Sequence, residues 1–316
     1  MIGLMAMTRS TEPVPPSTEA STPGPRLVPT RRVSFEASLQ AVPRHFAEDG
    51  DLISSHLVAA LSSVFPEGED YFVRCVRHFR SEITEPAFKR QVAGFIGQES
   101  VHGREHRAFN ERLAQLGYPT RLYDRIAKRA LATRYKVASP KSNLAVTAAL
   151  EHFTATLAEH VLTSEETRDR LGHQAVRELF VWHALEESEH KAVAFDVYRA
   201  VGGSERMRIW TMKAIRTSFV VFMTLAVLGS LAGDRSSYRP GALRSSWKRL
   251  KDSPMLSRDM WDALREYDRR GFHPDDRDTT GLVDTCPAPP EQRRPRRRQP
   301  RRHHQGRDAD RPVVSL

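Results

Sequence analysis

Cysteine is scarce in this chain, which has only Cys75 and Cys286 among its 316 residues. Cys75 lies in a stretch with helical periodicity and Cys286 in a proline-rich stretch near the C-terminus, so we expect no disulfide between them. Neither belongs to a CxxC pair, which excludes the usual cysteine-based zinc site. Such cysteine usage is typical of proteins in reducing compartments, and we predict a cytoplasmic location.

Other signals are also missing. Between Arg31 and His273 almost no segment alternates apolar and polar residues as a half-buried strand does. The sequence has no GxSxG nucleophile motif and no nucleotide, flavin or haem motif. The first 25 residues have no basic stretch ahead of an apolar run, so we expect no secretory signal. These absences predict an all-α protein whose chemistry depends on other groups.

Positive charge is unevenly distributed. The net charge is +10, but residues 291–311 contain nine arginines against three acidic residues, which accounts for +6 of it. This arginine-rich tail contains no aromatic residue that would stack on a base. We therefore interpret the tail as a solvated basic extension and expect no nucleic-acid partner.

Residues 1–30 include six prolines, and both they and residues 276–316 are predicted to be disordered. Residues 31–275 are predicted to form one helical domain, with breaks marked by proline and glycine. The predicted helices span residues 46–62, 68–82, 86–116, 119–136, 142–163, 172–201, 205–233 and 256–270.

A short motif occurs twice in this domain, as ESVH at 99–102 and as ESEH at 187–190. Residues three apart share a face of a helix, so each glutamate and its histidine point the same way. The preceding helix offers one glutamate in each case, Glu69 before the first motif and Glu151 before the second. The surrounding residues are apolar, and a bound metal cation is the simplest way to neutralise the charge of carboxylates buried there.

A four-helix bundle that supplies one glutamate from each of two helices and Glu-x-x-His from each of the other two holds two metal ions. The sequence therefore predicts a ferritin-like four-helix bundle with additional C-terminal helices. Oxygen and nitrogen ligands without a thiolate favour iron, with manganese as the second choice and zinc if the protein is a hydrolase.

For two of the predicted ligands, the sequence offers a second glutamate nearby. Glu67 lies two residues before Glu69 on a different helical face, and Glu159 competes with Glu151. The apolar stretch AVTAAL just before Glu151 favours it over Glu159, and we favour Glu69 over Glu67. His183 lies four residues before Glu187 and is either a further ligand or a residue hydrogen-bonded behind the ligands.

Four other polar residues lie near the motifs. We expect His106 to be a core histidine or to support a ligand, one turn beyond the first motif. Asp196 is a candidate acceptor for the free N–H of a ligating histidine. Glu186 and Glu189 are expected to face outward or toward neighbouring helices.

Residues 31–275 resemble the bacterial predicted metal-dependent hydrolases, a family similar to the ferritin-like di-iron proteins. The segments that carry the resemblance are RRVSFE, FPEGEDYF, FIGQESVHGREHRAFN, ALEHFTA and WHALEESEHKAVAFDVY. The His-x3-Glu-x2-His run at 183–190 also resembles the last ligand helix of the di-iron arylamine N-oxygenases, which use an extra histidine. Together these resemblances imply seven ligands: Glu69, Glu99, His102, Glu151, His183, Glu187 and His190.

Three functions follow from such a site. The first is oxygen-dependent oxidation or oxygenation of an apolar or amphipathic small molecule, with electrons from a separate donor. The second is metal-dependent hydrolysis, which the family's description suggests. The third is non-catalytic iron binding. The sequence leaves open whether the protein forms a homodimer.

The segment 217–233 has no charged residue. As a helix it would span roughly 26 Å, short of the roughly 30 Å hydrocarbon core of a bilayer. We therefore expect a helix buried against the bundle. An apolar wall that lines the route of a substrate is one alternative. Because basic and aromatic residues follow the segment, peripheral membrane contact through 217–250 is another.

Overall fold

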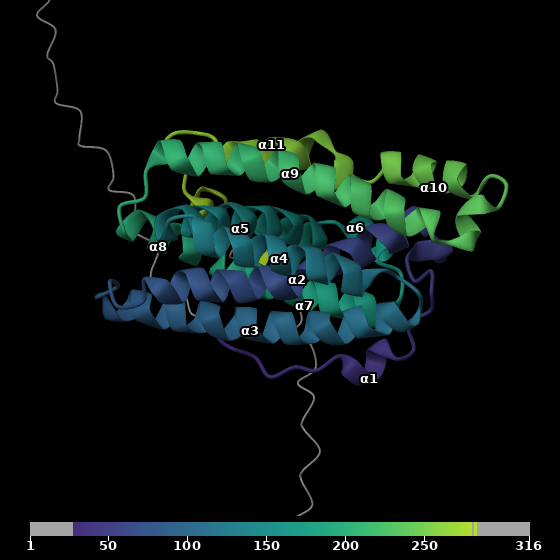
Figure 1. Ribbon diagram of the computed structural model, residues 1–316, viewed down its shortest axis with the longest axis horizontal. Coiled ribbons are helices and arrows are strands. Elements are labelled where there is room, and N and C mark those ends of the chain that lie inside the picture. The colour runs from purple at the N-terminus through teal and green to yellow at the C-terminus, as the bar shows by residue number, and fades with distance from the viewer. Residues whose placement is uncertain (1–27, 280, 283–316) are drawn as a thin grey trace, which may run out of the picture.

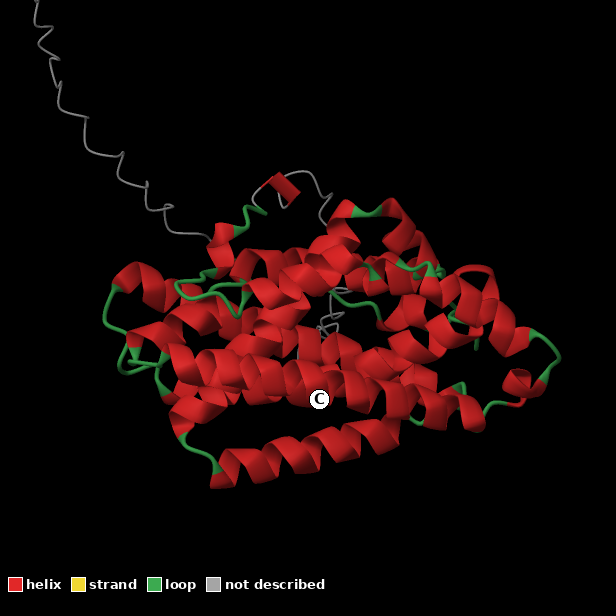
Figure 2. Cartoon of the chain, turned by 90° about the horizontal axis from the view of Figure 1, so that it is seen from above, coloured by secondary structure: helices red, strands yellow, loops and turns green. Residues whose placement is uncertain are grey.

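The computed structural model describes residues 28–279 together with 281 and 282. These residues form α-helices, short 3-10 turns and loops, without a β-strand, which confirms the all-α prediction (Figure 2). Most of the terminal segments predicted to be disordered, together with Cys286 and the arginine-rich tail, lie outside the described residues. Cys75 is buried with a free thiol.

Four long helices form the centre of the molecule: α2 (Leu52–His78), α3 (Pro86–Gln115), α5 (Pro140–Thr163) and α7 (Gln174–His190). Helix α2 packs against α3, and α5 packs against α7. Contacts between α2 and α5 and between α3 and α7 close these two pairs into a bundle (Figure 1). The glutamates and histidines of the repeated motif therefore lie on helices that face one another.

Local sequence explains where these helices begin. Pro86 occupies the first turn of α3, and the side chain of Glu85 accepts hydrogen bonds from the backbone N–H groups of Ala87 and Phe88. Pro140 occupies the first turn of α5 in the same way, with Ser139 as the capping residue. Proline suits this position because its missing N–H would have no helical partner there.

Two predicted helices, 46–62 and 68–82, are in fact one helix, so the predicted break at Pro66 was wrong. Proline removes the N–H that would bond to the carbonyl four residues earlier, here that of Ser62. The side chain of Asn110 on α3 donates to this carbonyl at 2.9 Å. The neighbouring helix thus replaces the lost hydrogen bond, and α2 continues through the proline.

The helix predicted at 172–201 was also wrong in its extent. Helix α7 ends at His190, and α8 (Val193–Ala200) follows after a turn. The remaining helices surround the bundle: α1 (Glu36–Leu39), α4 (Thr120–Val137), α6 (Glu165–Arg170), α9 (Glu205–Ala232), α10 (Ala242–Lys251) and α11 (Arg258–Glu266). Helices α9, α10 and α11 form a layer along the top of the bundle in Figure 1.

The helix predicted to be buried at 217–233 belongs to α9, which is only partly buried. One face of α9, including Met212, Met223 and Val227, packs against α2 and α5. The opposite face carries large apolar side chains that are exposed. Among the described helices, α9 is the one long and apolar enough to cross a membrane, and 28% of its apolar window is buried. Its two faces therefore have different surroundings.

Apolar side chains fill the bundle on both sides of a polar layer. On α3, Val92 and Phe95 belong to one apolar cluster, and Phe109 and Leu113 belong to another. Glu99 and His102 lie between these clusters. Because both clusters contain residues from several helices, they hold the helices around the polar layer in fixed positions.

Candidate metal centre

All seven predicted ligands meet in this polar layer. Each of the four central helices contributes at least one, and none is more than 5% exposed. They are Glu69 on α2, Glu99 and His102 on α3, Glu151 on α5, and His183, Glu187 and His190 on α7. The structure therefore brings together every residue that the motifs selected.

One half of the cluster surrounds the side chain of His190. Its Nε2 lies 3.0 Å from Oε1 of Glu99, 3.5 Å from Oε2 of Glu151 and 3.6 Å from Oε2 of Glu187. Ligand atoms of Glu99, Glu187 and His190 all lie within 4.8 Å of one another, a spacing that fits a single cation. Glu151 flanks this group.

The other half surrounds the side chain of His102. Its Nδ1 lies 3.5 Å from Oε1 of Glu99 and 3.8 Å from Oε1 of Glu187. Ligand atoms of Glu69, Glu99 and His102 lie within 4.8 Å of one another, and so do those of His102, His183 and Glu187. Glu99 and Glu187 therefore belong to both halves of the cluster.

Many of these atoms have no hydrogen-bond partner. Both carboxylate oxygens of Glu69, Glu99 and Glu151, Nδ1 of His102 and Nε2 of His190 are buried and make no well-formed hydrogen bond, although Oε1 of Glu99 lies within ion-pair distance of both histidines. Buried polar atoms in folded proteins are almost always hydrogen-bonded, and buried charges are paired or bind metal. The unpartnered atoms come from four helices and point to the same space, so the donor set fits metal ions.

The ionisation of the metal-free cluster is strongly perturbed. Burial and the neighbouring carboxylates of Glu99 and Glu187 raise the pKa of Glu69 and Glu151 well above the ordinary value of 4.5. Burial opposes the charged form of His102, but hydrogen bonds and charges of neighbouring glutamates raise its pKa to about 10. The cluster thus retains protons when no cation neutralises its carboxylates.

The histidines of the two motifs are held crosswise. Nε2 of His102, on α3, lies 3.0 Å from Oε2 of Glu186 on α7. Nδ1 of His190, on α7, lies 2.8 Å from the amide oxygen of Gln98 on α3. In each motif, the residue just before the ligand glutamate therefore accepts the N–H of the histidine in the other motif. These hydrogen bonds direct the second ring nitrogen of each histidine into the cluster.

Glu186 and Glu189 face the neighbouring helix α3, which is one of the two predicted orientations, and they do not face outward. Glu186 is fully buried and Glu189 is 9% exposed. Arg31, from the segment before α1, forms ion pairs with both carboxylates at 3.1 and 2.5 Å. Glu189 also accepts a hydrogen bond from the amide nitrogen of Gln98. The sequence signal was the polar residue before each motif, Gln98 and Glu186.

His183 is held by a different chain of contacts. Its Nδ1 lies 2.7 Å from Nε2 of His106, and Nδ1 of His106 lies 2.9 Å from the hydroxyl of Ser62. His106 is fully buried, so the structure places it behind a predicted ligand, as expected. Nε2 of His183 lies 2.9 Å from Oε1 of Glu187, whose other oxygen accepts a hydrogen bond from Thr154.

The other candidates lie away from the cluster. Asp196 accepts from His273 at 2.8 Å, so its predicted contact with a ligating histidine was wrong. The end of α7 at His190 separates α8 from the ligand face, and Asp196 turns with α8. Glu67 pairs with Lys128, and Glu159 pairs with Arg277.

A second group with metal-like composition is satisfied without a cation. Asp234 Oδ2 lies 2.8 Å from His45 Nε2, 3.1 Å from His56 Nε2 and 3.2 Å from Arg44 Nε. One carboxylate oxygen therefore already has three partners, one of them a guanidinium. We interpret this group as a polar contact that fastens the end of α9 to α2 and to the chain before it.

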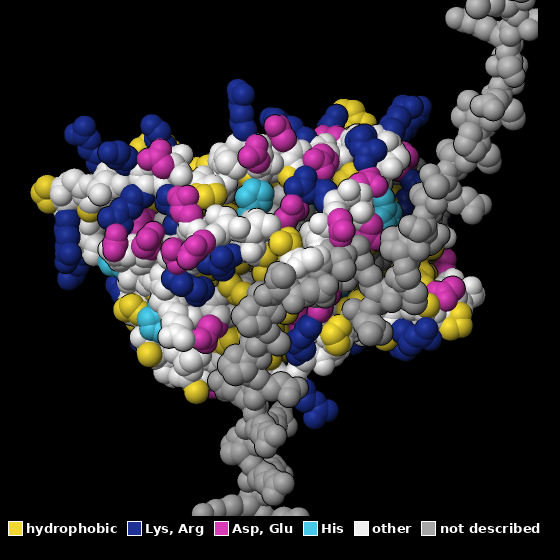
Figure 3. All heavy atoms as spheres, turned by 180° about the vertical axis from the view of Figure 1, so that it is seen from behind, with side chains coloured by type: hydrophobic (Ala, Val, Ile, Leu, Met, Phe, Trp, Pro, Cys, Tyr) yellow, Lys and Arg dark blue, Asp and Glu magenta, His cyan; other side chains and the backbone are white. Residues whose placement is uncertain are grey.

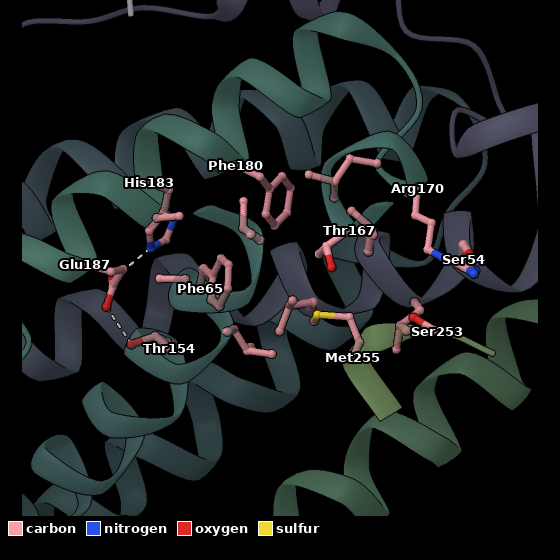
Figure 4. Close-up of a pocket in the computed structure, with 18 of the residues that line it drawn as sticks. Ser54, Phe65, Thr154, Thr167, Arg170, Phe180, His183, Glu187, Ser253 and Met255 are labelled. Atoms are coloured by element: carbon pink, nitrogen blue, oxygen red, sulfur yellow. Dashed lines mark hydrogen bonds and ion pairs between the residues drawn. The ribbon is translucent and has the colours of Figure 1, made fainter. Parts of the chain in front are cut away.

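Two apolar cavities reach the cluster. One has a volume of about 110 Å³, with His183 and Glu187 at one end and Arg170 at the other, as Figure 4 shows. The other has a volume of about 280 Å³, lies between α2, α4, α5 and α9, and reaches Glu69, His183 and Glu187. Aliphatic and phenyl side chains form most of both walls. A small apolar molecule would fit beside the polar layer without displacing the ligands.

The crosswise hydrogen bonds lead to a testable prediction. The substitution Glu186→Gln removes the charge that faces His102 and leaves Arg31 with one fewer carboxylate. Because partners behind metal ligands usually contribute 10- to 100-fold to metal affinity, we expect an affinity loss of about that size. Competition with a chromophoric chelator measures it. Glu178→Gln, also on α7 but bonded only to Gln174 among the contacts described, is the matched control and should bind metal like wild type.

Fold and site together define an all-α helical bundle with a buried carboxylate–imidazole cluster suited to metal. The sequence matches the model of the family described as predicted metal-dependent hydrolase over residues 29–278. Since the match covers most of the chain, the protein belongs to that family. No curated protein and no solved structure matches the sequence.

Proposed function

We propose that the protein is a di-metal enzyme, with iron as the native metal, that oxidises or oxygenates an apolar or amphipathic small molecule with dioxygen. The observation that supports this proposal most directly is the set of unpartnered ligand atoms beside an apolar cavity. The ligand pattern, two single glutamates and two Glu-x-x-His pairs on four helices, is that of ferritin-like di-iron proteins.

The seven side chains have distinct roles in this proposal. Glu69 and His102 would hold one ion, and Glu151 and His190 the other. Glu99 and Glu187 would bridge them, since each lies close to both histidines of the repeated motif. His183 would complete the set. Two iron ions held there would supply oxygen activation, with electrons from a separate donor.

The chain's own groups prepare the site for such chemistry. Thr154 donates to Glu187 at 2.6 Å and fixes the orientation of a carboxylate that faces both cavities. The apolar walls exclude water from the polar layer and favour a substrate with little hydrogen-bonding capacity. Phe65 lies 5.0 Å from the ring of His183, between ring centroids, so a rigid aromatic surface borders the reacting region.

Hydrolysis is the second candidate, because the family is described as metal-dependent hydrolases. In that case redox-inactive zinc would replace iron, and the reaction would proceed without oxygen. Both functions use the same ligands, so substitutions at the metal site do not distinguish them.

Oxygen dependence does distinguish them. Protein loaded anaerobically with ferrous iron is expected to consume oxygen on mixing with air, and a panel of long-chain alcohols and alkylated phenols is expected to yield products that contain label from ¹⁸O₂ or are oxidised. Glu187→Ala should show neither. The result that would overturn the proposal is cleavage of the corresponding esters by zinc-loaded protein under argon, with no oxidation by the iron form.

A further inference from the structure

The outward face of α9 is an extended apolar surface. Trp210, Val221, Leu225 and Leu228 are 71%, 52%, 65% and 58% exposed. Their spacings of eleven, four and three residues place them on one stripe of the helix. Since the opposite side of α9 packs on α2 and α5, this stripe points away from the bundle. Soluble proteins rarely expose several large apolar side chains on one helix face without a partner.

Basic and aromatic residues lie beyond the C-terminal end of the stripe. Residues 235–251, which include a short 3-10 turn and α10, contain six arginines or lysines, all exposed, and no acidic residue. Tyr238 and Trp247 in this segment are 73% and 56% exposed. Aromatic and basic side chains beside an apolar surface are typical of proteins that lie in a membrane interface. The face seen in Figure 3 differs, because charges of both signs are interspersed there.

We propose that the exposed stripe of α9 and the basic segment 235–251 dock the protein on the surface of an anionic lipid bilayer. The apolar side chains would enter the boundary between headgroups and acyl chains, and the basic side chains would contact lipid phosphates. Helix α9 lies on the bilayer and does not cross it, because Met223, Ala226 and Val227 on its inner face belong to the core.

The charges favour a bilayer over a second copy of the chain. In a two-fold dimer the same surface meets itself. If two α9 helices paired antiparallel, the basic segment 235–251 of one copy would lie near Arg206 and Lys213 of the other, at the N-terminal end of the stripe. Parallel pairing would place the two basic segments together. Both arrangements bring like charges together, whereas anionic lipid neutralises them.

Docking on this side would also turn the opening of the larger cavity toward the bilayer. Ile215, Ser218, Phe219 and Phe222 on α9 line it, and Ile126 on α4, which is 44% exposed, lines its other edge. The opening between α4 and α9 therefore borders the proposed docking surface. A membrane-soluble substrate would have a short path to Glu187, a consequence that rests on the proposed function, whereas the docking itself does not.

Vesicle co-sedimentation of the full-length protein tests the docking. Wild type is expected to bind vesicles of phosphatidylcholine mixed with phosphatidylglycerol, and Leu225→Gln to bind about tenfold more weakly, because a large apolar side chain no longer enters the bilayer. Val137→Gln is the matched control, since Val137 is 79% exposed at the end of α4. The arginine-rich tail is present in all three proteins and cannot produce a difference between them.

A second variant tests the charges. Arg244→Glu combined with Lys248→Glu should weaken binding to the anionic vesicles about tenfold or more, and the loss should shrink at high salt. Wild type that fails to bind, or Leu225→Gln and Val137→Gln that bind equally, would overturn the proposal. So would a wild-type dimer in sedimentation velocity that Leu225→Gln converts to a monomer, because the stripe would then be a protein interface. None of these results depends on enzyme activity.

Discussion

Replacement of Glu99 or Glu187 by alanine is expected to abolish tight metal binding while the helical bundle remains folded. Both carboxylates lie close to His102 and to His190, so either substitution removes a shared ligand from both halves of the cluster. The fold should persist because apolar clusters hold the helices on both sides of the polar layer. We expect about two iron or manganese ions per wild-type chain and nearly none in either variant.

Elemental mass spectrometry on protein purified without chelator measures this loss, and far-ultraviolet circular dichroism verifies the fold. Glu111→Ala is the matched control, because Glu111 lies on α3 with Glu99 but pairs with Arg121 at the surface. It should retain both ions. Folded wild type that binds no metal after anaerobic reconstitution with ferrous iron would contradict the assignment and would leave the motifs without a metal-binding role.

Removal of metal is expected to destabilise the protein, and the effect should grow as the pH rises. The raised pKa values of Glu69, Glu151 and His102 mean that the metal-free fold is stabilised by their protonated forms. That stabilisation is complete below the unfolded pKa, 4.5 for the glutamates and 6.5 for the histidine. It is lost as the pH rises through the pKa values of the folded protein, and the pKa of His102 there is about 10.

The metal-bound protein should behave in the opposite way, since ions compete with protons for the same atoms and bind more tightly at higher pH. Binding that saturates at a thousandfold excess over Kd stabilises by about 4 kcal/mol. For a domain of this size that corresponds to a rise in Tm of roughly 10 °C. Differential scanning fluorimetry with and without chelator, at about pH 6 and about pH 8.5, measures the difference in Tm between the metal-bound and the metal-free protein. If this difference in Tm stays constant or becomes smaller as the pH rises, Glu69, Glu151 and His102 do not ligate the metal.

Pro66 lies inside α2, where a proline would be expected to end a helix. Proline predicts a helix break from local geometry alone, yet α2 continues because Asn110 of another helix satisfies the carbonyl of Ser62. The compensating side chain lies 48 residues away in the sequence. The local sequence shows only that Pro66 removes a hydrogen bond from its own helix. It could not reveal that Asn110 of another helix replaces this bond.

Local sequence also could not predict which residues hydrogen-bond to His102 and His190. Helical periodicity places Glu99 and His102 on one face but does not say which helix that face meets. Gln98 and Glu186 look like ordinary neighbours of the ligand glutamates until the two motif helices are packed together. Only then does each residue reach the histidine of the other motif.

The sequence by itself determined the helical class and the two Glu-x-x-His pairs, because residues three apart share a face of any α-helix. The helix before each motif offered Glu69 and Glu151, and the resemblance to known families added His183. Tertiary packing decided the rest. It set the crosswise contacts of Gln98 and Glu186, turned Asp196 away with α8, and left one face of α9 uncovered. These features depend on distances between helices far apart in the chain, which no local pattern encodes.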